Sequence, residues 1–106
     1  DMFLSVVTIH ELEIGILRLA RRDPFQAGQF RKWLTDYILP SFDGQILPVS
    51  VEVAQWSAAY HVPDPAPFRD SFIAATAHVH GLTVVTRNTS NFLHCGVPLL
   101  NPWQPR

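Results

Sequence analysis

Short apolar runs alternate with longer amphipathic segments along the chain, and this alternation constrains the possible fold most strongly. Runs suited to buried strands cover Phe3–Val7, Gln45–Val49, Leu82–Thr86 and Val97–Leu100. Unbroken apolar strands separated by helices are typical of a mostly parallel sheet with helices on both faces. The sequence therefore predicts an α/β fold with three layers, in which a parallel β-sheet is flanked by helices.

Four helices are expected between and around these runs. They cover Thr8–Arg22, Phe25–Ile38, Ser50 (as the cap) to about His61, and Phe68 to Gly81. Gly81 stands where helices commonly end in a left-handed glycine, and Leu39-Pro40 is expected to end the second helix. The apolar residues expected to be buried in that helix are Phe30, Trp33, Leu34, Tyr37 and Ile38.

Composition limits the class of protein. A chain of 106 residues with 47% hydrophobic and 16% charged residues is expected to be one globular domain, residues 1–106. A formal net charge of -1 gives no general attraction to nucleic acid, so RNA binding would depend on local cations or a bridging metal. The single cysteine, Cys95, cannot form an internal disulfide, which favours the cytoplasm. No apolar run approaches the roughly 18–20 residues that span a membrane.

Two carboxylates lie near the predicted strands, at positions suited to a ligand-binding site. One follows the first strand, and the other begins the helix that leads into the third strand. Ligands of parallel sheets bind beyond the carboxyl ends of the strands. Glu11 is expected in the first turn of the helix that leaves Phe3–Val7, and Asp70 in the first turn of the last helix. The small residues of Ala74–Ala77 would let that last helix lie close against the sheet and carry Asp70 to its edge.

Each of these carboxylates also has a purely structural interpretation. Thr8 and Glu11 fit the spacing of a capping box, in which the glutamate reaches back to the cap backbone. Asp70 would be stabilised by about 0.3–1 kcal/mol at a helix N-terminus. Two carboxylates at neighbouring helix starts can instead share a hard cation such as Mg²⁺. Both interpretations stay open on spacing alone.

Three blocks of the sequence resemble one known family. Leu4–Ile16 is similar to the pattern S-x-V-T-x-x-E-L-x-x-G-I of VapC-type PIN-domain ribonucleases, and Asp70–Ala77 to the family's D-x-x-I-A-A-T-A. Gly81–Asn88, with Asn91-Phe92 and Asn101-Pro102-Trp103, resembles the family's closing segment. The blocks occur in the family's order and span nearly the whole chain, so the sequence is identified as a VapC-type toxin of a toxin–antitoxin system.

The resemblance implies a Mg²⁺- or Mn²⁺-dependent endoribonuclease that cleaves RNA phosphodiesters. Glu11 and Asp70 match the family's catalytic, metal-binding carboxylates. Residues that match supporting or substrate-positioning places are Thr86, Arg87, Asn88 and Asn91. The implied partners are an RNA substrate, a VapB-type antitoxin and a second copy of the chain, packed through the first helices.

The sequence departs from the family in two respects. Asn88 and Asn91 stand where relatives often carry acidic residues, which lowers the charge of the expected site. Relatives also begin with a central strand ending in aspartate, between the strands that match Phe3–Val7 and Leu82–Thr86, and the sequence has no counterpart. Omitting that strand leaves a gap of about 10 Å, so we expect these two runs not to pair directly. The strand would come from a longer gene product or a second chain. The alternative function is a catalytically inactive PIN-like remnant that binds an antitoxin or dimerises.

Other sites are less favoured. His10-Glu11 begins a zinc-protease motif, but Ile14 stands where its second histidine is required. His78 and His80 are two residues apart on a helix and point in different directions. His94-Cys95 has no second ligand pair for zinc. A flavodoxin-like receiver domain is the most distant possibility, because paired acidic residues do not follow the first strand.

Overall fold

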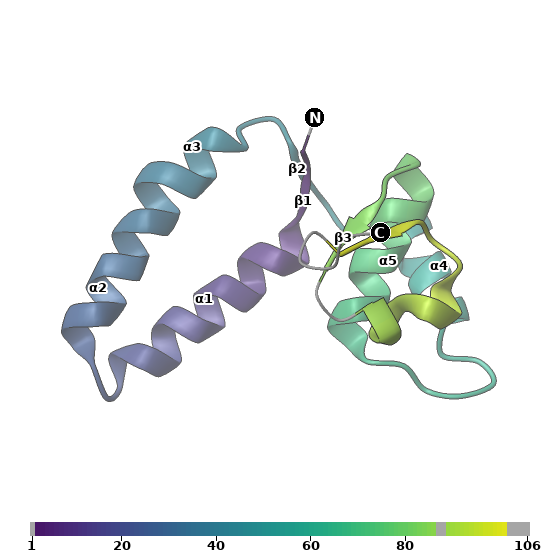
Figure 1. The fold of residues 1–106 in the computed structure, drawn as a ribbon, viewed down its shortest axis with the longest axis horizontal. Helices are drawn as coiled ribbons and strands as arrows, with labels where there is room; N and C mark the ends of the chain where they lie inside the picture. The colour runs from purple at the N-terminus through teal and green to yellow at the C-terminus, as the bar shows by residue number, and fades with distance from the viewer. Residues whose placement is uncertain (1, 87–88, 102–106) are drawn as a thin grey trace. The chain divides into compact units, whose positions relative to one another are not determined.

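The computed structural model describes residues 2–86 and 89–101, and the chain divides into two compact units (Figure 1). The N-terminal unit is Asp1–Pro48 and the C-terminal unit is Val49–Arg106. Arg87 and Asn88 lie outside the described residues. Each unit has its own parallel strand pair and its own hydrophobic cluster.

The N-terminal unit is a pair of helices joined to a short parallel strand pair. Its elements are β1 (Leu4–Ser5), α1 (Val6–Ala20), α2 (Pro24–Trp33), the π-helical segment η1 (Leu34–Ile38), α3 (Leu39–Ser41) and β2 (Ile46–Leu47). Asp23 caps α2, because its Oδ1 accepts a hydrogen bond from the Gln26 N–H at 3.0 Å. β1 pairs with β2 in parallel, with Leu4 opposite Ile46.

The start of α1 differs from the prediction. The helix begins at Val6, since the Ser5 side chain accepts a hydrogen bond from the Val7 N–H at 3.0 Å and so acts as the N-cap. The predicted capping box of Thr8 and Glu11 is therefore wrong, and Glu11 lies in the second turn rather than the first. The β-branched residues after Ser5 suggested a longer strand, but their helix penalty is only a few tenths of a kcal/mol and is readily overridden.

The second helical region also extends beyond its predicted end. The Leu39 N–H bonds to the Leu34 carbonyl, an i to i+5 bond that forms the π-helical segment, and helix continues through Pro40 to Ser41. Pro40 lies in the first turn of α3 and has no backbone N–H, so it leaves no hydrogen-bond donor unpaired there. The helical path is thus continuous past the proline that was expected to stop it.

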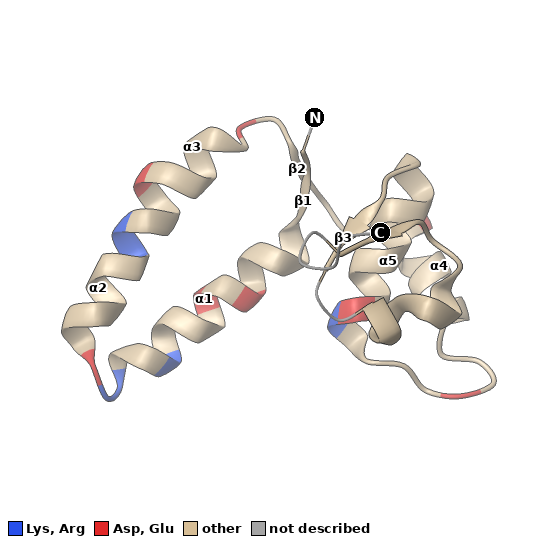
Figure 2. Cartoon of the chain, in the orientation of Figure 1, with Lys and Arg blue, Asp and Glu red and all other residues tan. Residues whose placement is uncertain are grey.

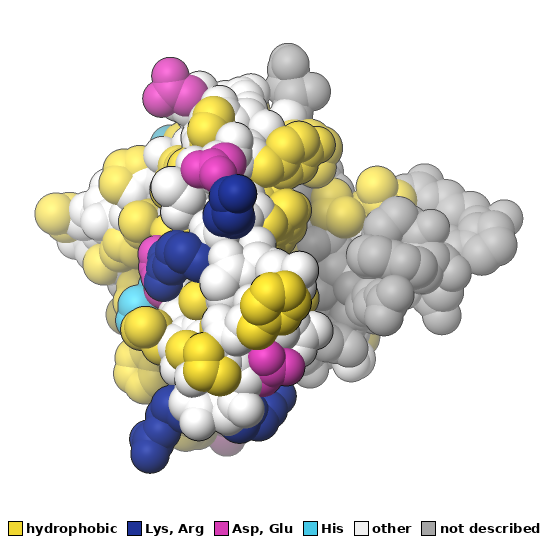
Figure 3. Space-filling view, turned by 90° about the vertical axis from the view of Figure 1, so that its left-hand side faces the viewer, with side chains coloured by type: hydrophobic (Ala, Val, Ile, Leu, Met, Phe, Trp, Pro, Cys, Tyr) yellow, Lys and Arg dark blue, Asp and Glu magenta, His cyan; other side chains and the backbone are white. Residues whose placement is uncertain are grey.

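The core of the N-terminal unit is small. Ile16, Ala27 and Leu34 are buried, and partly buried neighbours complete the cluster: Ile9, Leu12, Leu19, Ile38 and Leu39. The predicted burial of Leu34 is confirmed, whereas that of three aromatic residues of the same region is wrong. Phe30, Trp33 and Tyr37 are 44%, 42% and 62% exposed. Figure 3 shows hydrophobic side chains at the surface among charged ones.

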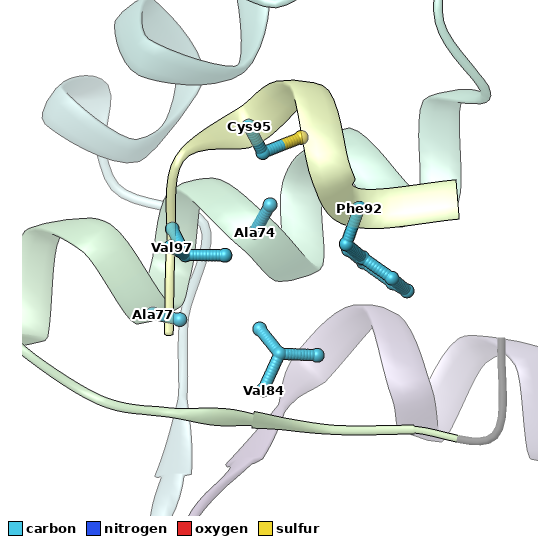
Figure 4. Packing of buried hydrophobic residues seen from close by; sticks show 6 residues of the cluster. All are labelled: Ala74, Ala77, Val84, Phe92, Cys95 and Val97. Carbon is cyan, nitrogen blue, oxygen red and sulfur yellow. The ribbon is translucent and has the colours of Figure 1, made fainter. Parts of the chain in front are cut away.

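The C-terminal unit contains two helices that pack against each other and a second parallel strand pair that contacts the later helix. Its elements are α4 (Val51–Ala59), α5 (Phe68–His80), β3 (Val84–Val85), the 3-10 helix η2 (Thr89–Cys95) and β4 (Leu99–Leu100). Two helix boundaries that were predicted from the sequence are confirmed: the start of α4 and the end of α5. Ser50 caps α4 through the Val53 N–H at 3.2 Å, and Gly81 ends α5 with φ 67°. The buried cluster, shown in Figure 4, consists of Ala74, Ala77, Val84, Phe92, Cys95 and Val97.

The predicted α/β class with parallel strands is confirmed. The strands are shorter than expected, and in the described residues they form two separate sheets, β1 with β2 and β3 with β4. β1 and β3, which we expected not to pair with each other, belong to different sheets. Among the residues described, no helix has the length and apolar character needed to cross a membrane.

Candidate metal and catalytic site

Glu11 lies beside an apolar groove of the N-terminal unit. The groove has a volume of about 330 Å³ and runs between α1 and α2. Apart from Glu11, its lining residues are uncharged: Leu12, Gly15, Ile16, Leu19, Phe30 and Trp33. The groove therefore has a largely apolar lining with one negative charge, which the half-buried Glu11 supplies. Figure 2 shows acidic positions in the middle of α1.

Asp70 occupies the first turn of α5, as predicted. The helix cap is Pro67, whose side chain makes no capping hydrogen bond, so the first-turn N–H groups depend on other acceptors. The half-buried Asp70 carboxylate lies in the favourable field of these N–H groups. Arg69 and Asp70 are neighbours in the first turn of α5.

Cys95 lies close enough to Asp70 to sense its charge. Burial raises the pKa of the Cys95 thiol, and the negative charge of Asp70 raises it further. The thiol also lies 3.5 Å from Nε2 of His94. The interaction of Cys95 with Asp70 places η2, which carries Cys95, near the start of α5. The raised pKa keeps the Cys95 thiol protonated at neutral pH.

A pair of hydrogen-bonded side chains supports the turn that carries Asp70. Nε2 of His61 lies 3.0 Å from Oγ of Ser71, and Nδ1 of His61 accepts a hydrogen bond from the Ala66 N–H at 3.2 Å. Ser71 is 1% exposed and its hydroxyl lies 2.9 Å from the carbonyl oxygens of both Pro67 and Phe68. This pair is not predictable from the sequence, because no spacing signal links a histidine after one helix to a serine inside the next.

The remaining predicted site residues are only partly described. Thr86 follows β3, and its N–H donates to the Leu100 carbonyl at 3.0 Å. Asn91 is exposed on η2, and η2 packs against α5. Asp70, Thr86 and Asn91 thus belong to the C-terminal unit, whereas Glu11 belongs to the N-terminal unit. The convergence of Glu11 and Asp70 on one ion stays a prediction.

The carboxylate oxygens of Glu11 and Asp70 are the type of ligand atom that a hard cation prefers. Among the residues that the structure describes, neither Glu11 nor Asp70 forms an ion pair. The salt bridge found there joins Arg31 and Glu13. Mg²⁺ is commonly held by one or two carboxylates together with waters and substrate phosphates, so two such side chains are a sufficient donor set. Within the described ranges no group of three or more His, Cys, Asp or Glu side chains is placed to hold a metal.

The histidines do not provide a zinc site in the part of the chain described. His78 packs instead against Trp56, with ring centroids 3.9 Å apart and an interplanar angle of 48°. His94 contacts Cys95 and Tyr60. These contacts support the ordinary packing roles expected for the histidines.

Comparison with known proteins identifies the family. The PIN domain family matches residues 1–95 of the chain. The chain belongs to the PIN-domain family. Within it, this PIN domain is 34% identical to the VapC ribonuclease Y4jK of Sinorhizobium fredii, over 98% of its own length and 76% of that protein. It is 37% identical to Toxin FitB of Neisseria gonorrhoeae, over 97% of its own length and 76% of FitB. The predicted resemblance to VapC-type toxins is confirmed.

Solved structures agree with this assignment. The crystal structure of FitAcB from Neisseria gonorrhoeae matches 99% of this PIN domain and 78% of the solved chain, with a TM-score of 0.89 and 34% identity. A structure of FitAB bound to an IR36 DNA fragment matches it with the same TM-score, over 100% of this chain and 76% of that one, at 32% identity. The predicted PIN-like fold is therefore confirmed.

Proposed function

We propose that this PIN domain is a Mg²⁺- or Mn²⁺-dependent endoribonuclease that acts as the toxin of a VapBC-type toxin–antitoxin system in the cytoplasm. The main support is the pair of half-buried carboxylates, Glu11 and Asp70, at the positions that match the family motifs. Neither is neutralised by an ion pair among the described residues. The relative named VapC ribonuclease Y4jK supports RNA cleavage as the reaction. The two compact units would together form one PIN-like domain.

In this proposal Glu11 and Asp70 hold the divalent ion. When bound, such an ion stabilises negative charge on the phosphate oxygens and lowers the pKa of a bound water. Asp70 would orient that water by accepting a hydrogen bond from it, and Arg69 beside it would bind an RNA phosphate through its guanidinium. Thr86, Arg87, Asn88 and Asn91 position the substrate or the ion.

The proposed protein partners are an antitoxin and a second copy. The relatives include a toxin, FitB, and solved structures named FitAcB and FitAB. A VapB-type antitoxin would neutralise the toxin by placing a cationic side chain against the acidic site. Exposed aromatic residues of the N-terminal unit, Phe30, Trp33 and Tyr37, support a homodimer, because burying them would remove a large apolar area from water.

An RNA-cleavage assay with Mg²⁺ tests the proposed function. Asp70→Asn and Glu11→Gln should each lower the cleavage rate about 100-fold or more, since loss of a metal-binding carboxylate removes several kcal/mol of transition-state stabilisation. Asp36→Asn and Glu52→Gln are matched controls, because each changes an exposed carboxylate of one unit outside the proposed site. Equal rates for the unmodified chain and Asp70→Asn would remove the enzyme proposal.

The second candidate function is an inactive PIN-like module that binds an antitoxin or dimerises. One observation favours it: Asn91 brings no charge to a place where relatives often carry an acidic residue. This candidate predicts a stable dimer or antitoxin complex together with no Mg²⁺-dependent cleavage. The same assay, combined with light scattering, separates the two.

A further inference from the structure

The loop between α4 and α5 is fastened to α5 by the ring of His61. The loop covers residues 60–67, which include His61 itself and three prolines, Pro63, Pro65 and Pro67. One ring nitrogen of His61 bonds to the Ala66 backbone and the other to the buried Ser71 hydroxyl. A single side chain therefore joins the end of the loop to the first turns of the next helix.

The hydrogen bonds assign a direction to this link. Nδ1 of His61 accepts the Ala66 N–H, so it carries a lone pair and the ring proton lies on Nε2. Nε2–H then donates to Oγ of Ser71 at 3.0 Å. The Ser71 hydroxyl proton is left to donate to the Pro67 or Phe68 carbonyl, each 2.9 Å away. The chain of donors runs from the loop backbone through His61 and Ser71 back to the helix start.

The start of α5 has no side-chain cap. Its cap, Pro67, offers no side-chain acceptor, and Phe68 is 72% exposed. Helix ends fray when their first turn lacks partners. The Phe68 ring does contact the His61 ring, with centroids 5.0 Å apart, so His61 also covers this turn by packing. Asp70 lies in that turn, directly before Ser71.

We propose that His61 is a positioning residue for Asp70: through Ser71 it fixes the first turn of α5 and so the direction of the Asp70 carboxylate toward a divalent cation. The inference rests on the proposed function, because it assigns Asp70 as a metal ligand. Residues that orient a metal ligand typically change metal affinity by 10–100-fold when removed. His61 acts on affinity through geometry and need not touch the ion.

The test measures Mn²⁺ binding to the full chain by calorimetry, with RNA cleavage as a second readout. His61→Ala and Ser71→Ala should each raise the Mn²⁺ dissociation constant about tenfold, while the cleavage rate at saturating Mn²⁺ falls much less. The double variant should bind as weakly as either single variant, because both interrupt one link. His61→Gln, which keeps an N–H donor for Ser71, should recover most of the affinity.

Two controls separate positioning from loss of fold. His80→Ala changes an exposed histidine at the far end of α5 and should leave Mn²⁺ binding unchanged. Hydrogen exchange at the Ala66 amide should accelerate in His61→Ala while the helix signal of the chain is retained. If His61→Ala fails to fold, Ser71→Ala and His61→Gln still measure the link.

Each outcome decides the inference. Unchanged Mn²⁺ affinity in His61→Ala and Ser71→Ala, with Asp70→Asn clearly weakened, overturns the positioning role and leaves the proposed function standing. Mn²⁺ binding that is equally strong in Asp70→Asn and the unmodified chain, or absent from both, overturns the metal site at Asp70 and the inference with it.

Discussion

Arg31 holds both carboxylate oxygens of Glu13 across the two helices of the N-terminal unit. Its Nη1 donates to Oε2 at 2.8 Å, and its Nη2 lies 2.6 Å from Oε1. Such fork-to-fork geometry is the strongest form of an arginine–carboxylate pair. The Arg31 hydrogen bonds keep the pKa of Glu13 below its ordinary value of 4.5, and Arg31 in turn has a raised pKa.

The first prediction concerns acid stability. A carboxyl whose pKa is lower in the folded chain stabilises the fold above pH 4.5 and loses that contribution as pH falls through the folded value. Glu13→Gln should therefore lower the free energy of unfolding at pH 7, and its difference from the unmodified chain should shrink as the solution is acidified below pH 4.5. Urea unfolding across pH 3–7 measures this. A constant difference over that range would contradict the assignment to ionised Glu13.

A pair of glycine substitutions tests the end of α5. Gly81 has φ 67°, where an alanine side chain is strained, so Gly81→Ala should destabilise the chain by about 1 kcal/mol. Gly28 lies inside α2, and a Cβ added there meets nothing within 4 Å, so Gly28→Ala should stabilise by about 0.5–1 kcal/mol. Urea unfolding of both variants should give shifts of opposite sign. A stabilising Gly81→Ala would be inconsistent with the left-handed cap.

The helix signals that depend on one or two residues were predictable from the sequence. Ser50 as a cap and Gly81 as a terminator act through local backbone geometry, and both predictions are confirmed. The start of α1 was harder, because Ser5 and Thr8 are both capping residues in one short stretch and only the Ser5–Val7 hydrogen bond decides between them. Periodicity grouped Leu34 and Trp33 on an apolar helix, but it carries no information on which side the rest of the unit covers.

The candidate site was predictable as a set of residues rather than as geometry. The motifs name Glu11 and Asp70 and place both on helices. They say nothing of His61 and Ser71, whose contact depends on the path of the loop between α4 and α5. They also gave no sign of Cys95 near Asp70, because that proximity follows from the packing of η2 on α5.

Tyr60 provides a prediction about buried polarity. Its hydroxyl oxygen is buried and has no hydrogen-bond partner among the described residues, and burial raises the pKa of Tyr60 above 10.0. Leaving a buried hydroxyl unpaired costs about 1–3 kcal/mol, so Tyr60→Phe should leave stability unchanged or raise it by about 1 kcal/mol. The exposed Tyr37→Phe is the control and should change stability by less than about 0.5 kcal/mol. Thermal and urea unfolding measure both variants. A clear destabilisation of Tyr60→Phe would show that the Tyr60 hydroxyl has a hydrogen-bond partner and would contradict this prediction.

The last prediction uses Cys95 to report on the charge of Asp70. Burial and the Asp70 charge both raise the pKa of the thiol above 9.0, and the thiolate is the form that reacts with alkylating reagents. At pH 8 the folded chain should therefore react with iodoacetamide more slowly than the urea-unfolded chain. Asp70→Asn removes the negative charge, lowers the pKa of Cys95 and should accelerate the reaction, with its pH profile moved to lower pH. Glu52→Gln, which removes an exposed charge of the same unit, should leave the rate unchanged. Identical pH profiles for Asp70→Asn and the unmodified chain would show that burial alone governs Cys95 and that Asp70 lies too far away to act on it.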